Sequence, residues 1–280
     1  MSVRHDEELR RLSVHEFCRS DLPLDVFLKA CAGAGVGSVD LLRAPVERFG
    51  LDKAVHLLGQ LGLTVGSYSA AGYWSTGYDS DGSLWTLEEN IRQLEAAAAL
   101  GAGVQVLAGG PLDLVNRDID GGRRRVAEGI RELWPHAAER GIRLAIEPLH
   151  PIFCPSRSVV TSLRFGLDLV EDIPAQWGGI ALDSYHVWWD PELEGQVQRA
   201  AGRIFTVHID DFILPLPPDL RRRGLMGEGC IDLAGFRRLV EAAGYTGNYT
   251  VEVLNEELDA LPPAAAMGRI VESYRAFMRN

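Results

Sequence analysis

The sequence predicts a single eight-stranded parallel β/α barrel, and three observations support this prediction. The chain has 280 residues, of which 46% are hydrophobic, and this length suits one barrel domain. Short β-branched or apolar runs alternate with longer amphipathic stretches, as expected of repeated β/α units around a parallel sheet. Glycines that end helices recur at regular intervals, and no Pro/Ser-rich linker marks a second domain over 1–280.

The predicted strands are eight short runs with the length and composition typical of buried strands. They are residues 12–17, 36–41, 63–68, 104–108, 142–147, 179–183, 203–208 and 249–253. The clearest helices between them are 86–100 and 122–139, both rich in Ala, Leu, Glu and Arg. We therefore expect a helix to connect most strands to the next parallel one.

Several predicted helices end in a glycine that is followed directly by the next strand. Glycine accepts the left-handed conformation that ends many helices, so these positions predict where helices stop. The glycines are Gly35, Gly62, Gly101, Gly141 and Gly244.

The same alternation is compatible with a closed barrel or an open doubly wound sheet. No GxGxxG or phosphate-binding loop follows the first strand, which removes the usual reason to favour a nucleotide-binding open sheet. Two connections, 69–85 and 209–231, exceed ordinary length, and long loops in compact domains are usually functional. We expect both at the active face of the barrel.

Charge and composition limit the classes of partner. The net charge is −11 and the pI about 5.1, whereas nucleic-acid binding requires a basic surface, so no nucleic-acid partner is expected. Four cysteines without metal-site spacing indicate neither a disulfide framework nor a structural zinc site. No apolar run is long enough for a membrane span, and the charged first residues do not resemble a signal peptide, so we expect a soluble cytoplasmic protein without membrane association.

Four polar side chains stand at the ends of consecutive predicted strands: Glu147, Asp183, His208 and Glu252. In a barrel these ends meet at the C-terminal face. Taken singly, such residues are often helix caps, salt-bridge partners or core histidines. Three carboxylates at one barrel mouth, however, would repel each other unless a cation or protonation relieved them. Oxygen-rich ligation with one imidazole suits one Mn²⁺, Mg²⁺, Co²⁺ or Zn²⁺ ion.

Four segments, IRLAIEPLHP, ALDSYHVWWDP, RGLMGEGCIDLAGF and EAAGYTGNYTVEV, carry a family resemblance that runs from about residue 11 to the C-terminus. The chain resembles the xylose isomerase-like TIM barrel superfamily, which includes sugar phosphate isomerases and epimerases and barrels of the AP endonuclease family 2 type. The resemblance implies that the metal ligands are Glu147, Asp183, His208 and Glu252.

The resemblance also implies substrate contacts. His186, three residues after Asp183, matches a histidine that touches substrate oxygens, and Arg223 matches a position that grips a hydroxyl or phosphate. The sugar epimerases place a further Glu where this chain has Phe153, which implies a different pocket. Arg157 is either a substrate contact or a surface arginine that caps the following helix.

Aromatic side chains near the predicted strand ends suit a sugar-like ligand, because rings stack on the apolar face of a pyranose or cyclitol. Tyr68 and Trp188 are the candidates for substrate contact, and the alternative is that they pack helices onto the barrel. For His15, at the end of the first strand, we expect packing, with substrate contact as the alternative.

The implied activity is that of a divalent-metal-dependent sugar or polyol isomerase or epimerase of carbohydrate metabolism. Such an enzyme removes a proton next to a carbonyl and passes through a metal-bound enediolate. Glu147 and Glu252 are the expected catalytic carboxylates, suited to deprotonation on one face and reprotonation on the other, together with His186. The resemblance further implies a homodimer or homotetramer.

Three alternatives accompany this interpretation. A dehydratase of a keto-cyclitol or keto-sugar, similar to inosose or dehydroshikimate dehydratases, would begin with the same proton abstraction and could use His186 as the acid. A three-zinc endonuclease would need further histidines on strands three and four. The sequence there reads GSYSAA and VLAGG, and neither segment contains a histidine. A non-catalytic sugar-binding barrel would leave the four carboxylate and imidazole groups without a role.

Overall fold

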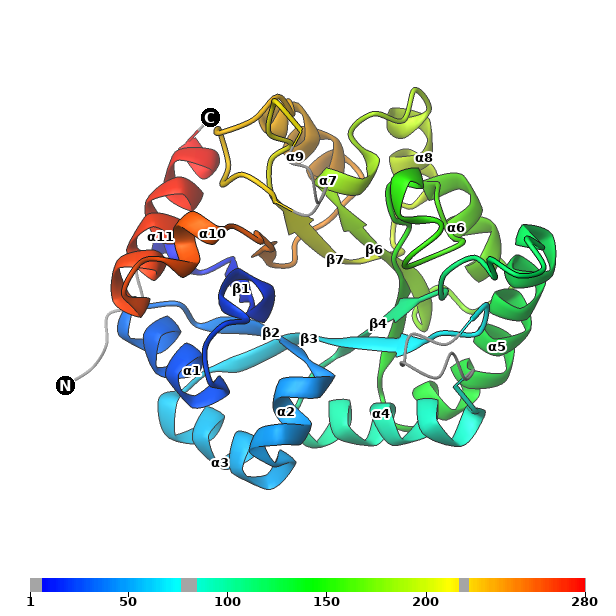
Figure 1. The fold of residues 1–280 in the computed structure, drawn as a ribbon, viewed down its shortest axis with the longest axis horizontal. Coiled ribbons are helices and arrows are strands. Elements are labelled where there is room, and N and C mark those ends of the chain that lie inside the picture. Colours follow the sequence, from blue (N-terminus) through cyan, green and yellow to red (C-terminus); the bar gives the residue numbers. More distant parts are fainter. Residues whose placement is uncertain (1–6, 77–84, 217–221, 280) are drawn as a thin grey trace.

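The structure is a computed structural model that describes residues 7–76, 85–216 and 222–279. It confirms the predicted barrel: strands β1 to β8 follow one another in sequence order around a closed sheet, and β8 pairs in parallel with β1. The helices surround this sheet (Figure 1). Because every strand is parallel to its neighbours, all carboxyl ends lie at one face of the barrel.

The strands agree with the predicted runs to within a few residues. They are β1 (Leu12–His15), β2 (Ser38–Leu42), β3 (Thr64–Gly72), β4 (Val104–Ala108), β5 (Arg143–Ile146), β6 (Gly178–Asp183), β7 (Ile204–Ile209) and β8 (Tyr249–Val251). The largest difference concerns β3, which continues through Gly72, so the predicted long loop 69–85 begins as strand. Residues 77–84 of that loop lie outside the described residues. The same holds for residues 217–221 of the other predicted long connection, 209–231.

The helices include both that were predicted most clearly. The α-helices are α1 (Leu24–Gly33), α2 (Arg43–Phe49), α3 (Leu51–Leu61), α4 (Leu87–Ala99), α5 (Ile119–Glu139), α6 (Leu163–Val170), α7 (Ser184–Val187), α8 (Leu193–Arg199), α9 (Leu233–Ala242), α10 (Glu256–Asp259) and α11 (Pro263–Arg279). Short 3₁₀ turns are η1 (Glu7–Leu9), η2 (Glu16–Arg19) and η3 (Pro151–Phe153). In the described ranges, no helix has the length and apolar character required to cross a bilayer.

The predicted helix stops are confirmed by backbone geometry. All five glycines have positive φ angles, between 67° at Gly62 and 86° at Gly244. This region is costly for residues with a Cβ atom, so glycine lets the chain leave the helix and enter the next strand within few residues.

Side-chain alternation along the strands separates the barrel interior from the helix-facing core. On β5, Leu144 and Ile146 join the large cluster formed with the helices, whereas Ala145 belongs to a separate small cluster with Val106 and Phe205. Glu147 follows on the same face as Ala145 and lines the cavity, as does Val106. On this side of the barrel, apolar side chains therefore fill the interior below, and the ionisable side chain of Glu147 stands above them at the C-terminal face.

The connection after β7 is held by one buried carboxylate, that of Asp211. Its backbone exchanges two hydrogen bonds of 2.9 Å with Gly224. Its side-chain oxygens accept the backbone N–H groups of Phe212, Gly227, Gly229 and Ile231 at 2.9 to 3.0 Å. Asp211 thereby fixes the segment that carries Arg223 into the barrel mouth.

Replacing Asp211 by alanine is expected to lower the free energy of unfolding by about 3 kcal/mol, because four backbone N–H groups lose a charged acceptor. Urea unfolding followed by circular dichroism measures this change. Asp232→Ala is the comparison, since Asp232 caps α9 through one bond to Gly235 and its loss should cost about 1 kcal/mol. An equal or smaller effect at Asp211 would contradict the role given to its carboxylate.

Candidate metal centre

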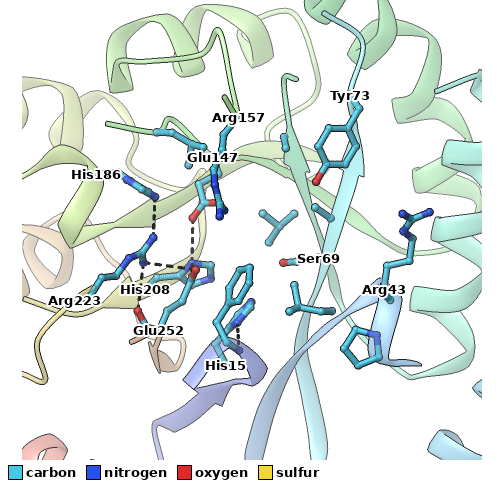
Figure 2. A pocket seen from close by; sticks show the side chains of 18 residues that line it. His15, Arg43, Ser69, Tyr73, Glu147, Arg157, His186, His208, Arg223 and Glu252 are labelled. Carbon is cyan, nitrogen blue, oxygen red and sulfur yellow. Dashed lines mark hydrogen bonds and ion pairs between the residues drawn. The ribbon is translucent and has the colours of Figure 1, made fainter. Parts of the chain in front are cut away.

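Four side chains from consecutive strand ends meet at the mouth of the barrel. Glu147 and Glu252 directly follow β5 and β8, Asp183 is the last residue of β6, and His208 lies in β7. One donor atom of each lies within 4.8 Å of the others. Figure 2 shows Glu147, His208 and Glu252 converging at one end of a cavity. The structure thus brings together the four residues that were predicted from the sequence as metal ligands.

His208 lies between two carboxylates. Its Nδ1 atom is 2.7 Å from Oε2 of Glu252 and 3.2 Å from Oε1 of Glu147. Burial alone would lower the pKa of His208, but the charges of Glu252 and Glu147 outweigh it and raise the pKa well above its usual value. The imidazole therefore donates a proton to the carboxylates and acts as a cation between them.

Asp183 is fully buried, and its two oxygens have different partners. Oδ1 accepts the backbone N–H of Tyr185 at 2.8 Å, while Oδ2 accepts Nη1 of Arg223 at 3.0 Å. The same Nη1 donates to Oδ2 of Asp210 at 2.6 Å. Burial and the charge of Asp210 raise the pKa of Asp183 well above its usual value, and burial raises the pKa of Asp210 to about 6. Arg223 reduces the repulsion between the carboxylates of Asp183 and Asp210 but does not cancel it.

Glu252 lies between positive charges. Oε1 is 3.6 Å from Nη1 of Arg223, and Oε2 contacts His208. Burial acts to raise the pKa of Glu252, yet His15, His208 and Arg223 together hold it well below its usual value. Glu252 is therefore ionised at neutral pH.

This donor set fits a divalent cation. Three carboxylates and one imidazole converge, and hard divalent ions favour oxygen ligands supplemented by histidine nitrogen. With Asp210 included, four buried or half-buried acidic groups face two cationic groups, Arg223 and His208. A metal ion would offset this excess of acidic groups, so the cluster could bind one.

A cavity of about 230 Å³ opens beside the cluster. Its wall includes apolar side chains such as Leu42, Val106 and Leu149. The polar and aromatic lining residues labelled in Figure 2 are His15, Arg43, Ser69, Tyr73, Glu147, Arg157, His186, His208, Arg223 and Glu252.

His186, on α7, is a neutral imidazole in the cavity wall. Its Nδ1 accepts the backbone N–H of His150 at 3.2 Å, and its Nε2 lies 3.3 Å from Nη2 of Arg223. Nε2 lies 3.6 Å from Oδ2 of Asp183. Burial and the nearby charge of Arg223 lower the pKa of His186 well below its usual value.

The two candidate substrate-binding arginines differ in their surroundings. Arg157 lines the cavity with its guanidinium 5.9 Å from the ring centre of Phe153, and Ser162 rather than Arg157 caps the following helix. Arg223 also lines the cavity, but its guanidinium is bound to Asp183 and Asp210. Arg223 therefore orders the acidic cluster as well as facing the cavity.

Tyr68 and Trp188, two predicted substrate contacts, lie outside the described lining of the cavity. Ser67 points into the barrel and Ser69 lines the cavity, so alternation along β3 turns the fully buried Tyr68 toward the helices. Trp188 follows α7 and packs against Phe212, with ring centres 5.2 Å apart. Neither belongs to the described cavity lining.

Sequence reasoning missed Asp210, and for His15 it favoured packing over the alternative of substrate contact. Asp210 bonds to Arg223 and to the Oγ of Ser184, and its only sequence signal is the paired acidic residues after the seventh strand. His15 lines the cavity, with its Nδ1 accepting the backbone N–H of Phe17 at 3.1 Å. Burial lowers the pKa of His15. These contacts depend on strand register, which the residue types alone do not determine.

The fold and the cluster define a closed β/α barrel with a candidate divalent-metal centre at its C-terminal face. A family model, the xylose isomerase-like TIM barrel, matches residues 28–277. The chain belongs to this family.

Known relatives extend the comparison. A solved structure of protein SMc04130 from Sinorhizobium meliloti 1021 has a TM-score of 0.90 and 34% identity, over 96% of this chain and 98% of that one. A 3-dehydroshikimate dehydratase of Pseudomonas aeruginosa is 34% identical over 146 residues, which are 50% of this chain and 22% of the dehydratase. L-Ribulose-5-phosphate 3-epimerase UlaE of Escherichia coli is 24% identical over 158 residues, 56% of this chain and 51% of the epimerase. The matches thus span about half or less of these two curated relatives.

Binding of Mn²⁺ is expected to release a proton and to strengthen as the pH rises. Below the raised pKa of His208, Nδ1 keeps the proton that it donates to Glu147 and Glu252, and this proton occupies the lone pair that a metal ion needs. Calorimetric titration of the metal-free protein in two buffers of different ionisation enthalpy counts the protons released. Binding without proton release, at an affinity unchanged from mildly acidic to mildly alkaline pH, would contradict this expectation.

Proposed function

We propose that the protein is a divalent-metal-dependent sugar or polyol isomerase or epimerase. The observation that carries this proposal is the pair Glu147 and Glu252, which contact the same nitrogen of His208 at the end of a 230 Å³ cavity. Such a cavity suits a small polyhydroxylated molecule better than a polymer. The net charge of −11 likewise supports a small-molecule substrate rather than nucleic acid.

The metal ligands in this proposal are Glu147, Asp183, His208 and Glu252. The donor set is compatible with Mn²⁺, Mg²⁺, Co²⁺ or Zn²⁺. When bound, the ion would polarise a substrate carbonyl and make the adjacent C–H group more acidic.

Two carboxylates are available to move the proton. Glu147 has the more exposed side chain, at 17%, and Glu252 is 7% exposed. Glu252 is ionised because neighbouring positive charges lower its pKa, so its oxygens carry no proton at neutral pH. We assign proton removal and return to these two residues, which would interconvert epimers or an aldose and a ketose.

His186 and the two arginines serve substrate binding and orientation in this proposal. His186 presents a neutral imidazole to the cavity, and Arg157 presents a permanent positive charge on the same wall. Arg223 faces the cavity while bound to Asp183. The similarity to UlaE, named as an L-ribulose-5-phosphate 3-epimerase, supports epimerase as the class of activity.

A metal-dependent dehydratase of a keto-cyclitol or keto-sugar is the second candidate, and the 34% identity to the Pseudomonas dehydratase favours it. Loss of water needs a proton donor beside the departing hydroxyl. His186 is placed to be that donor, but its lowered pKa keeps it neutral, and a neutral imidazole is a weak acid. For this reason we favour isomerisation or epimerisation over dehydration.

For assembly we propose a homodimer or homotetramer.

Glu147→Gln and Glu252→Gln are expected to reduce substrate deuterium exchange by at least about 100-fold, because each removes a carboxylate that moves the proton. Wild type and variants would be analysed for bound metal and incubated in D₂O with a panel of ketoses, inososes and keto-acids while NMR follows the α-proton. Glu88→Gln is the control, since Glu88 lies on the surface of α4 and pairs with Arg92.

The products then separate the two candidates. An isomerised or epimerised sugar supports the first, and a dehydrated product supports the second. A wild-type protein that binds no divalent metal and exchanges no proton would contradict both.

A further inference from the structure

Asp40, on β2, is a carboxylate buried inside the barrel and held by hydroxyl groups from three other strands. Oδ1 accepts the hydroxyl of Ser13 at 2.6 Å. Oδ2 accepts the hydroxyls of Ser67 at 2.6 Å and of Thr250 at 3.2 Å. Asp40 has no exposed surface, so its orientation is fixed by these bonds.

The barrel also leaves room for this carboxylate. At Gly66, on β3, a Cβ atom would lie 2.7 Å from Oδ1 of Asp40, too close for a normal contact. Any larger residue at position 66 would push the carboxylate from its place. Within the described part of the chain, the side chain that pairs with Asp40 as a potential cation is His208, across the barrel on β7.

The two nitrogens of His208 face different groups. Nδ1 faces Glu147 and Glu252 in the acidic cluster. Nε2 is buried, has no hydrogen-bond partner among the described residues, and lies 3.8 Å from Oδ2 of Asp40. A neutral imidazole offers a lone pair at one nitrogen only when the other carries the proton. If Nδ1 binds a metal ion, the proton must therefore stand on Nε2, facing Asp40.

We propose that Asp40 is a positioning residue for the metal centre: its carboxylate holds the Nε2–H side of the His208 ring and so directs the Nδ1 lone pair toward the ion. At 3.8 Å the contact is electrostatic rather than a hydrogen bond. In a buried setting this suffices to favour an N–H group over a lone pair next to the carboxylate, because a lone pair would be repelled. Carboxylates that accept the other ring N–H of a ligating histidine commonly fix the tautomer and the ring orientation, and Asp40 faces the same ring nitrogen of His208 from a longer distance.

The inference rests on the metal site of the proposed function and makes a separate prediction. Asp40→Asn is expected to weaken Mn²⁺ binding by about 10- to 100-fold. Asparagine has the shape of aspartate, so a role in packing alone would leave the affinity unchanged. The measurement is competition of the purified protein with a fluorescent chelator for Mn²⁺, made first on wild type.

Ser67→Ala is the matched control. It removes a hydroxyl that donates to the same carboxylate and leaves the carboxylate itself, which faces His208, in the protein. We expect it to lower the free energy of unfolding while its Mn²⁺ affinity stays within about threefold of wild type, because Ser13 and Thr250 still hold Asp40.

A spectroscopic measurement keeps the inference testable if Asp40→Asn does not fold. In wild-type protein loaded with Zn²⁺, ¹H–¹⁵N correlation spectra of the histidine rings should show the His208 proton on Nε2, protected from exchange with water. A ring whose proton stands on Nδ1, or an Asp40→Asn protein with wild-type affinity, would overturn the role of Asp40 and leave the metal site intact. A wild-type protein that binds neither ion would overturn the metal site and this inference together.

Discussion

The buried charges at the barrel mouth constrain the rest of the structure. Asp183, Asp210 and Glu252 lie within reach of one guanidinium, that of Arg223, in a place from which water is largely excluded. Removing an ionised group from water is costly unless partners replace its solvation. The strand ends, the loop after β7 and the orientation of His208 together supply these partners.

The barrel provides those partners through two different devices. Parallel strands bring the ends of β5 to β8 to one face, which places the four proposed ligands without any special loop. Arg223, in contrast, comes from a segment outside the sheet, and Asp211 folds that segment back by accepting four backbone N–H groups. Strand order thus supplies the acidic side chains, and one loop supplies their permanent countercharge.

Much of this arrangement could be predicted from the sequence, because it depends on local signals. Glycines such as Gly62 and Gly141 end helices by their positive φ angles, and apolar runs locate the strands. The convergence of Glu147 with His208 followed from the fact that both stand at the ends of parallel strands. These inferences need only local residue patterns and the order of the strands along the chain.

The remainder depends on side-chain direction and on contacts across the barrel. Tyr68 and Ser69 are adjacent, yet only Ser69 reaches the cavity, because a strand turns successive side chains to opposite faces. The strand register that decides between them is set by pairing with β2 and β4. Asp40 illustrates the same limit: its partners come from β1, β3, β7 and β8, and no short sequence pattern joins them.

The two cations of the cluster differ in a way that bears on metal binding. Arg223 stays protonated under all ordinary conditions, so its charge is a fixed part of the protein. The charge of His208 can be removed, because the imidazole can release the proton that Nδ1 donates to Glu147 and Glu252. A divalent ion at that nitrogen would exchange one positive charge for two among the same carboxylates. Protonated His208 therefore holds Glu147 and Glu252 together where a metal ion could take the place of its Nδ1 proton, while Arg223 continues to hold Asp183 and Asp210.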